Sequence, residues 1–253
     1  MKTMSLPFGL YSRIQPLMSL LSARVRGLLR LVAIDAACAA CGARTAAFCA
    51  ECRIASGIPE AGARCALMGG RKLWFLASYW CRRVSPPVPT PAVEALLRFK
   101  HRADRQRGRS LARAFATALT EHARTFDAVV AIPASSTRAR ARALDPAAWF
   151  ARALAARGGV AFRSRLLQRR RDVRPQRGLG GAQRRSNVRG AFGTCAAVPD
   201  GYSLLLIDDV CTTGSTLGEA AAALEAAGAA RVELAVLACA DMALCRQCPS
   251  MID

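Results

Sequence analysis

An acidic pair followed by hydroxyl side chains is the feature of this sequence with the clearest chemistry. Asp208 and Asp209 follow an apolar run, and a polar turn comes three positions later: Thr212, Thr213, Gly214, Ser215 and Thr216. Two adjacent carboxylates can accept hydrogen bonds from a vicinal diol, directly or through Mg²⁺, which prefers oxygen ligands. Hydroxyls and free backbone N–H groups at a helix N-terminus favour a phosphate. The pattern therefore predicts a diol-binding pair followed by a phosphate-binding turn.

Each half of this motif also has a simpler interpretation. A Ser/Thr-rich turn before a helix is usually only a cap, and Thr216 with Glu219 has the spacing of a capping box. An Asp after a strand is often only a turn former. The functional interpretation is favoured because both halves occur together, directly after one apolar strand.

Four cysteines within fifteen residues form a second candidate site: Cys38, Cys41, Cys49 and Cys52. Each Cys-x2-Cys turn can present two thiolates to one face, and two such turns complete a tetrahedron around Zn²⁺ with Zn–S bonds of about 2.3 Å. We expect a structural zinc site, and the alternative is four free buried cysteines. Four further cysteines could build a second site, which we do not assign: Cys65, Cys81, Cys245 and Cys248.

The elements that must position these residues follow an α/β pattern. Residues 202–207 predict an apolar strand, 217–227 a helix and 231–238 a second strand, which together form a βαβ unit of a parallel sheet covered by helices. Ligands of such sheets bind beyond the carboxyl ends of the strands, where the acidic pair falls. The other expected elements are strands over 72–80 and 126–133, a helix from about 92 that is interrupted over 103–108 and resumes over 110–123, and a helix over 138–157 whose true start is near Pro146.

Three regions are expected along the chain: an amphipathic helix over 1–35, a zinc-binding module and linker over 36–90, and the α/β domain over 91–253. Four prolines within 84–91 mark the linker. The first region lacks acidic residues over 5–34, so a transit peptide would look similar, but an amphipathic helix is favoured. No stretch approaches 18 uninterrupted apolar residues, so no transmembrane segment is expected. The clustered cysteines favour a reducing, cytoplasmic location.

Charge is distributed unevenly in this chain of net charge +20. Residues 98–189 carry 23 basic and 5 acidic side chains, whereas residues 190–253 carry 2 and 8. A basic middle beside an acidic C-terminal third suggests an anionic partner held near a carboxylate-bearing site.

Residues 204–216 (LLLIDDVCTTGST) resemble the phosphoribosyl pyrophosphate (PRPP) motif of type I phosphoribosyltransferases. The order of the other landmarks resembles the ComF (competence protein F, GntX-like) family over residues 36–240. Those landmarks are the cysteine cluster, Arg98-Phe-Lys100, Ala131-Ile-Pro133, Arg169-x-Arg171 with Gln176, and Arg184-x-x-Asn187-Val-Arg-Gly-Ala-Phe192. The resemblance implies a type I phosphoribosyltransferase-like parallel sheet flanked by helices, with a small N-terminal four-Cys zinc module.

The resemblance also implies residue roles. Asp208 and Asp209 would be the catalytic pair at the ribose hydroxyls, and residues 212–216 would hold the 5′-phosphate. Lys100 would add positive charge to a pyrophosphate loop made of Ala134, Ser135, Ser136, Thr137 and Arg138. An arm would comprise Arg169, Arg171, Gln176, Arg184 and Asn187. The chain departs from the family pattern at Arg142-Ala-Leu-Asp-Pro146, where Arg-Gly-Phe-Asn-Gln is usual, and at Val173, where Thr is usual.

Two functions from different classes remain open. The first is a phosphoribosyltransferase that binds PRPP and Mg²⁺ and transfers phosphoribosyl to an acceptor that the sequence does not name. The second is a single-stranded DNA-binding protein of the DNA-uptake machinery, in which the PRPP site is regulatory or vestigial. Aromatic residues, at 6%, are few for base stacking. No histidine is needed for the first reaction, and His101 and His122 are expected on the surface.

Overall fold

The computed structural model describes residues 37–43, 45, 47–81, 85–134, 144–171 and 190–240. Residues 37–253 belong to one compact unit. The helix predicted over 1–35 lies outside the described residues. None of the helices within those ranges is long and apolar enough to cross a membrane.

A six-stranded sheet forms the centre of the fold, in the order β1-β2-β10-β9-β5-β6. β2 (Arg71–Ser78), β10 (Arg231–Cys239), β9 (Ser203–Cys211), β5 (Ala128–Ala131) and β6 (Ala161–Phe162) run parallel, and β1 (Arg64–Met68) is antiparallel to β2. The predicted parallel α/β sheet is therefore confirmed, with one antiparallel strand added at its edge.

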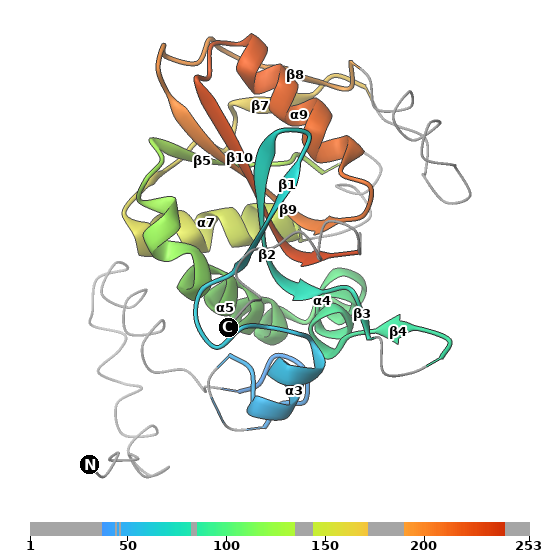
Figure 1. The fold of residues 1–253 in the computed structure, drawn as a ribbon. Coiled ribbons are helices and arrows are strands. Elements are labelled where there is room, and N and C mark those ends of the chain that lie inside the picture. The colour runs from blue at the N-terminus through green and yellow to red at the C-terminus, as the bar shows by residue number, and fades with distance from the viewer. Residues whose placement is uncertain are drawn as a thin grey trace. The chain divides into compact units, whose positions relative to one another are not determined.

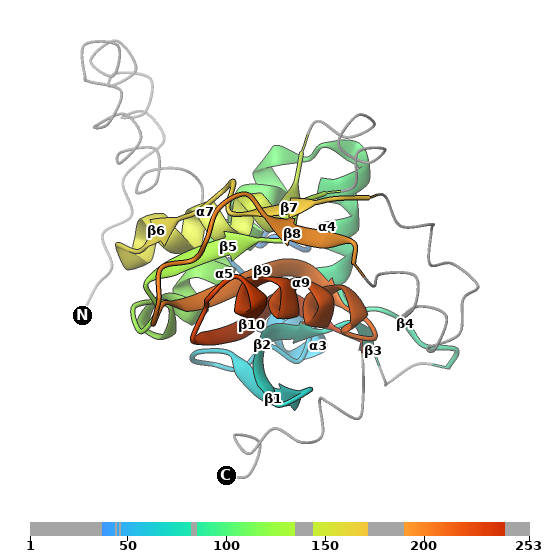
Figure 2. The same cartoon turned by 90° about the horizontal axis from the view of Figure 1, so that it is seen from above.

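Helices cover both faces of this sheet (Figures 1 and 2). Leu205 and Ile207 of β9 belong to a core shared with α4 (Pro91–Arg102), α5 (Arg105–Ala123) and α7 (Pro146–Gly158). Leu204 and Leu206 belong to the opposite core, under α9 (Ser215–Ala226) and the hairpin of β7 (Leu167–Arg169) and β8 (Phe192–Thr194). Because side chains alternate along a strand, one continuous apolar run supplies both cores.

Strands from the region assigned to the zinc module and linker enter the main sheet. β2 pairs with β10 from Leu73 to Ser78, and a short hairpin of β3 (Trp80–Cys81) and β4 (Val88–Pro89) follows before α4. α3 (Ala50–Ala55) sits next to the cysteines, and the Ser56 Oγ accepts the Ala92 N–H of α4 at 3.0 Å. The cysteine region is thus bonded directly to the first long helix.

The break between α4 and α5 is shorter than the sequence predicts. The expected interruption over 103–108 is reduced to two residues, because Asp104 caps α5 by accepting the Arg107 N–H at 3.1 Å. Gly108 lies inside α5, where a Cβ atom would overlap the ring of Phe99 on α4. Its role is therefore close helix packing, and Gly108 does not end a helix.

Candidate functional site

Asp208 and Asp209 lie within the last part of β9, and this corrects the predicted strand end at Ile207. The strand continues to Cys211 because β10 extends to Cys239 and pairs with it, Val210 opposite Ala238 and Cys211 opposite Cys239. On the other side of β9, the Ile132 N–H donates to the Ile207 carbonyl at 2.8 Å. The acidic pair and the residues that follow β5 are therefore at the same edge of the sheet.

Lys100 reaches this edge from the last turn of α4. Its Nζ lies 2.5 Å from Oδ2 of Asp209, and the two side chains are 16% and 18% exposed. The Asp209 backbone N–H donates to Oδ1 of Asp208 at 2.8 Å. The structure thus brings Lys100 together with the acidic pair, while its predicted role at the pyrophosphate stays a prediction.

A third carboxylate belongs to this group and was not assigned from the sequence. Asp145 caps α7 by accepting the Ala148 N–H at 3.3 Å. Burial is the main cause that raises the pKa of Asp145; the charge of Asp209 adds to the rise, and backbone N–H donors that include Ala134 oppose it. The Asp-Pro pair at 145–146 is a recognisable cap signal, but nothing in it indicates Asp209 as a neighbour.

The acidic environment changes the protonation of Asp208. Burial and then the charge of Asp209 raise the pKa of Asp208 to about 8, against the opposing effects of the Asp209 N–H and of Lys100. In the absence of a ligand, burial and the neighbouring carboxylate therefore favour the protonated form of Asp208. A bound cation or hydroxyl donor would favour the ionised form.

The hydroxyl turn leads from β9 into α9 and is shaped by Gly214. Gly214 is the N-cap residue at φ +71°, and a Cβ atom there would overlap the sulfur of Met68 at the end of β1. The Thr213 and Ser215 hydroxyl oxygens lie 3.0 Å apart. The capping box predicted for Thr216 and Glu219 is wrong, because Glu219 accepts the Gly190 N–H instead. The N-cap residue Gly214 has no side chain, and α9 has no side-chain cap hydrogen bond among the described residues.

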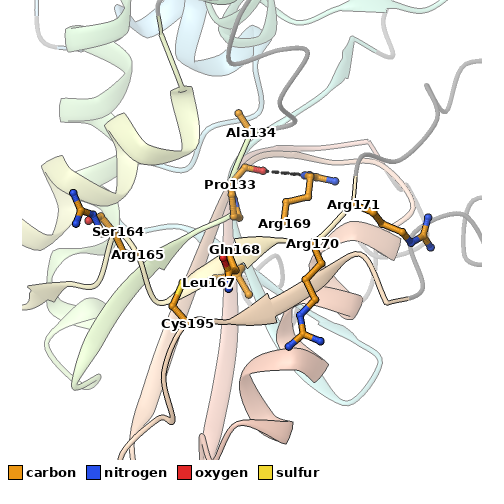
Figure 3. Close-up of a pocket in the computed structure, with 10 residues that line it drawn as sticks. All are labelled: Pro133, Ala134, Ser164, Arg165, Leu167, Gln168, Arg169, Arg170, Arg171 and Cys195. Atoms are coloured by element: carbon orange, nitrogen blue, oxygen red, sulfur yellow. Dashed lines mark hydrogen bonds between the residues drawn. The ribbon is translucent and has the colours of Figure 1, made fainter.

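The predicted pyrophosphate loop and arm are described only in part. Ala134 follows β5, whereas Ser135, Ser136, Thr137 and Arg138 lie outside the described residues, as do Gln176, Arg184 and Asn187 of the arm. Arg169 on β7 donates from Nη2 to the Pro133 carbonyl at 3.2 Å, and its guanidinium carbon stands 4.6 Å from the centre of the Phe192 ring. The base of the arm is thus bonded to the start of the loop, as Figure 3 shows.

The four N-terminal cysteines come together as predicted. The sulfur atoms of Cys38, Cys41, Cys49 and Cys52 all lie within 4.8 Å of one another, and those of Cys41 and Cys49 are 3.7 Å apart. Tetrahedral Zn²⁺ with Zn–S bonds of about 2.3 Å has sulfur–sulfur edges of about 3.8 Å. The cluster is therefore compatible with zinc binding.

The surroundings of this cluster favour a thiolate at Cys38, whereas burial and the neighbouring thiols raise the pKa of Cys52 and the pKa of Cys49 is raised as well. Burial alone would raise the pKa of the Cys38 thiol, but backbone N–H groups of Ala40, Cys41 and Cys49 lower it to about 6. Arg107 of α5 donates from Nη1 to the Ala39 carbonyl at 2.6 Å and to the Ala40 carbonyl at 2.5 Å. Arg107 was not assigned from the sequence, which has no local signal for a contact across 68 residues. Cys65 and Cys81 do not join the described cluster, and Cys245 and Cys248 lie outside the described residues.

Comparison with known proteins relates part of the chain to phosphoribosyl transferase domains. A phosphoribosyl transferase domain model matches residues 155–246, a segment that includes β9, the hydroxyl turn, α9 and β10. No curated protein sequence matches the chain.

One similar solved structure is glutamine PRPP amidotransferase from B. subtilis complexed with ADP and GMP. Its sequence is 19% identical, the match covers 50% of this chain and 26% of that chain, and the TM-score is 0.33. A structure of the allosteric regulatory enzyme of purine biosynthesis has 20% identity, coverages of 50% and 26%, and a TM-score of 0.31. Purine phosphoribosyltransferase from Pyrococcus horikoshii Ot3 has 13% identity, coverages of 51% and 82%, and a TM-score of 0.31. The match spans about a quarter of the first two chains. The domain match and the observed sheet together show a phosphoribosyltransferase-type α/β fold, with four clustered cysteines near the N-terminus.

Proposed function

We propose that this protein binds PRPP with Mg²⁺ and transfers its phosphoribosyl group to an acceptor, as a cytoplasmic protein of the ComF type. The observation that carries the proposal is that two carboxylates and a hydroxyl-rich turn follow one another at one edge of the sheet. Asp208 and Asp209 lie in the last part of β9, and the Gly214 turn at the N-terminus of α9 follows. A ribose 5′-phosphate presents a diol, which carboxylates can bind, and next to it a phosphate, which the N-terminus of a helix can bind.

The donor set at this edge also fits Mg²⁺. Asp208 and Asp209 offer carboxylate oxygens, the ligand type that Mg²⁺ selects over nitrogen or sulfur. When bound, the ion would neutralise charge on the pyrophosphate group. Asp208 would lose its proton as the diol or the ion arrives, since either interaction favours the carboxylate.

Different residues of the chain would have different roles in the substitution at the anomeric carbon. The bond from that carbon to the pyrophosphate oxygen breaks while a bond to the acceptor forms, and the transition state has oxocarbenium character at the ribose. Asp208 and Asp209 would orient the ribose. Arg169, which donates to the Pro133 carbonyl at the start of the predicted pyrophosphate loop, would stabilise charge on the departing pyrophosphate.

The DNA-binding alternative gains no support from the described residues. Phe99 and Phe115, two of the aromatic residues in the basic stretch, are 0% exposed and belong to the helix-side core. Stacking of single-stranded bases requires exposed rings among the cations. The surplus positive charge alone does not favour this function over the first.

Calorimetry with PRPP and Mg²⁺ tests the proposal. The wild type should bind, and Asp208→Asn should weaken binding at least tenfold because the amide donates where the diol also donates. Asp127→Asn is the matched control: Asp127 lies at the opposite end of β9, where it accepts the Ser203 N–H at 2.8 Å. Absence of binding to the wild type would refute the proposal, and an equal loss in both variants would refute the assigned role of Asp208.

A further inference from the structure

The hairpin of β1 and β2 contacts α9, the helix that follows the hydroxyl turn, near both of its ends (Figure 1). Near the C-terminal end, the Arg71 guanidinium donates to both carboxylate oxygens of Glu225, with Nε 2.6 Å from Oε1 and Nη2 2.5 Å from Oε2. At the N-terminal end, the sulfur of Met68 occupies the space that a Cβ atom on Gly214 would need. Met68 and Arg71 are paired directly across the hairpin, so one short element holds the helix at two points.

The Met68 thioether lies against the residues on either side of the turn at 212–213. Its sulfur accepts a hydrogen bond from the Cys211 thiol at 3.8 Å, and Cys211 is the last residue of β9. Gly214 is the N-cap residue of α9, and its carbonyl accepts the Gly218 N–H at 2.8 Å to close the first turn of the helix. Because Gly214 has no side chain to form a cap, packing against Met68 provides a restraint that a capping side chain would otherwise give.

The hairpin is itself held firmly by the rest of the fold. At the end away from its turn, the Ser78 N–H donates to the Ser56 carbonyl at 3.0 Å, and Arg64 donates from Nη1 to the Ser78 Oγ at 3.2 Å. Leu73 and Phe75 of β2 are 0% exposed and belong to the same core as the buried side of α9. The hairpin therefore cannot move away from α9 without breaking packed core contacts.

We infer that the β1–β2 hairpin positions the predicted phosphate-binding turn, with Met68 as a positioning residue. The hairpin lies outside the matched domain segment, which begins at residue 155, so nothing in that match assigns this role. The inference rests on the proposed function, because the turn is where the 5′-phosphate of PRPP would bind. Backbone N–H groups that are already held in place lose less conformational entropy when an anion binds. Loss of the hairpin contacts should therefore weaken binding without removing any group assigned to the ligand.

Calorimetry of the full chain with PRPP and Mg²⁺ tests the role of Met68. Met68→Ala should raise Kd about tenfold, because small displacements of a binding group have large effects on its interactions. Met68→Leu has nearly the same volume and should bind within about twofold of the wild type. Leu67→Ala is the matched control: Leu67 is the neighbouring residue of β1, is 60% exposed, and should be replaceable without loss.

A charge swap tests the second contact and does not depend on how well Met68→Ala folds. The Arg71 and Glu225 side chains are 23% and 36% exposed, so the effect of this ion pair should be smaller than that of Met68. Arg71→Glu brings two carboxylates together and should raise the Kd for PRPP about threefold. Arg71→Glu/Glu225→Arg restores an ion pair of reversed direction and should recover most of that loss.

Amide hydrogen exchange of the ligand-free protein separates this inference from the proposed function. In Met68→Ala, exchange over residues 212–218, which include the bonded Gly218 N–H, should rise about tenfold, while Leu67→Ala and the α7 segment stay at the wild-type rate.

If exchange rises in this way but the wild type does not bind PRPP, the proposed function fails and the positioning role of the hairpin stands. The inference is overturned if Met68→Ala exchanges like the wild type over 212–218, or if exchange in α7 rises equally. It is also overturned if the wild type binds PRPP and Met68→Ala binds it equally well.

Discussion

Lys100 and Asp209 form an ion pair, 2.5 Å from Nζ to Oδ2, that joins the last turn of α4 to the end of β9. Asp208 and Asp145 are the carboxyls that neighbour Asp209, and the pKa of each is raised. Among the described residues, Lys100 supplies the positive charge beside this group of three acids at the predicted ribose site. α4 therefore affects the charge of this site from outside the matched domain segment, which begins at residue 155.

Removing this cation should weaken PRPP binding. In Lys100→Met, Asp209 loses its partner and repels the phosphate groups of the ligand, so we expect at least a tenfold increase in Kd, with partial recovery in Lys100→Arg. Calorimetry with PRPP and Mg²⁺ measures both. Lys72→Met, at an exposed position of β2, is the control. Unchanged affinity in Lys100→Met would show that the ion pair plays no part in binding.

The raised pKa of Asp208 predicts the pH dependence of stability. This pKa is about 8 in the folded protein and near 3.8 in the unfolded chain, so the folded state binds the extra proton between those values. The free energy of unfolding should therefore fall as the pH rises through that window. Asp208→Asn cannot ionise, and its stability should gain on the wild type by up to about 4 kcal/mol between pH 5 and pH 8.5. Urea unfolding at both pH values measures this difference, and parallel profiles for wild type and variant would contradict it.

The position of Gly214 against Met68 predicts that an alanine there destabilises the protein by steric overlap, and Gly201 provides a control. Gly214→Ala must adopt φ +71° and also displace Met68, whereas Gly201→Ala must adopt φ +81° in open space. Each should lose about 1 kcal/mol from backbone strain, and Gly214→Ala should lose a further 1–3 kcal/mol from overlap. Urea unfolding should show this gap, and Met68→Ala added to Gly214→Ala should narrow it. Equal losses for the two alanine variants would show that Met68 moves aside freely.

The contact of Arg107 with the cysteine region predicts an effect on metal retention. The purified protein should contain one Zn²⁺ per chain, and Arg107→Ala should release it to a chelator more readily, with affinity reduced roughly 10–100-fold, as is typical when groups that position ligands are removed. The loss follows because the Ala39 and Ala40 carbonyls lose their donor beside Cys38 and Cys41. Arg109→Ala, exposed on the same helix, serves as the control. Zinc-free protein that is stable and folded would remove the basis for a structural zinc site.

The amino-acid sequence by itself determined four of the six strands of the main sheet and the order of the functional groups along β9 and the turn after it, because these depend on local patterns. Continuous apolar runs such as 204–207 are typical of buried strands in an α/β chain, and two Cys-x2-Cys turns already bring four sulfurs within reach of one another. The acidic pair and the Gly214 turn are adjacent in sequence, so their proximity required no tertiary information.

Only the tertiary structure decided which distant residues contact the acidic pair and the cysteine turns. Pairing with β10 extended β9 past the acidic residues, and helix packing brought Lys100 to Asp209 and Arg107 to the cysteine turns. His122, expected on the surface, is instead partly buried, with Nε2 2.9 Å from the buried carboxylate of Glu233. The side-chain contacts of Lys100, Arg107 and His122 join residues that are between 67 and 111 positions apart in the chain. A sequence pattern carries no information about such partners, since they are set by the packing of whole elements against the sheet.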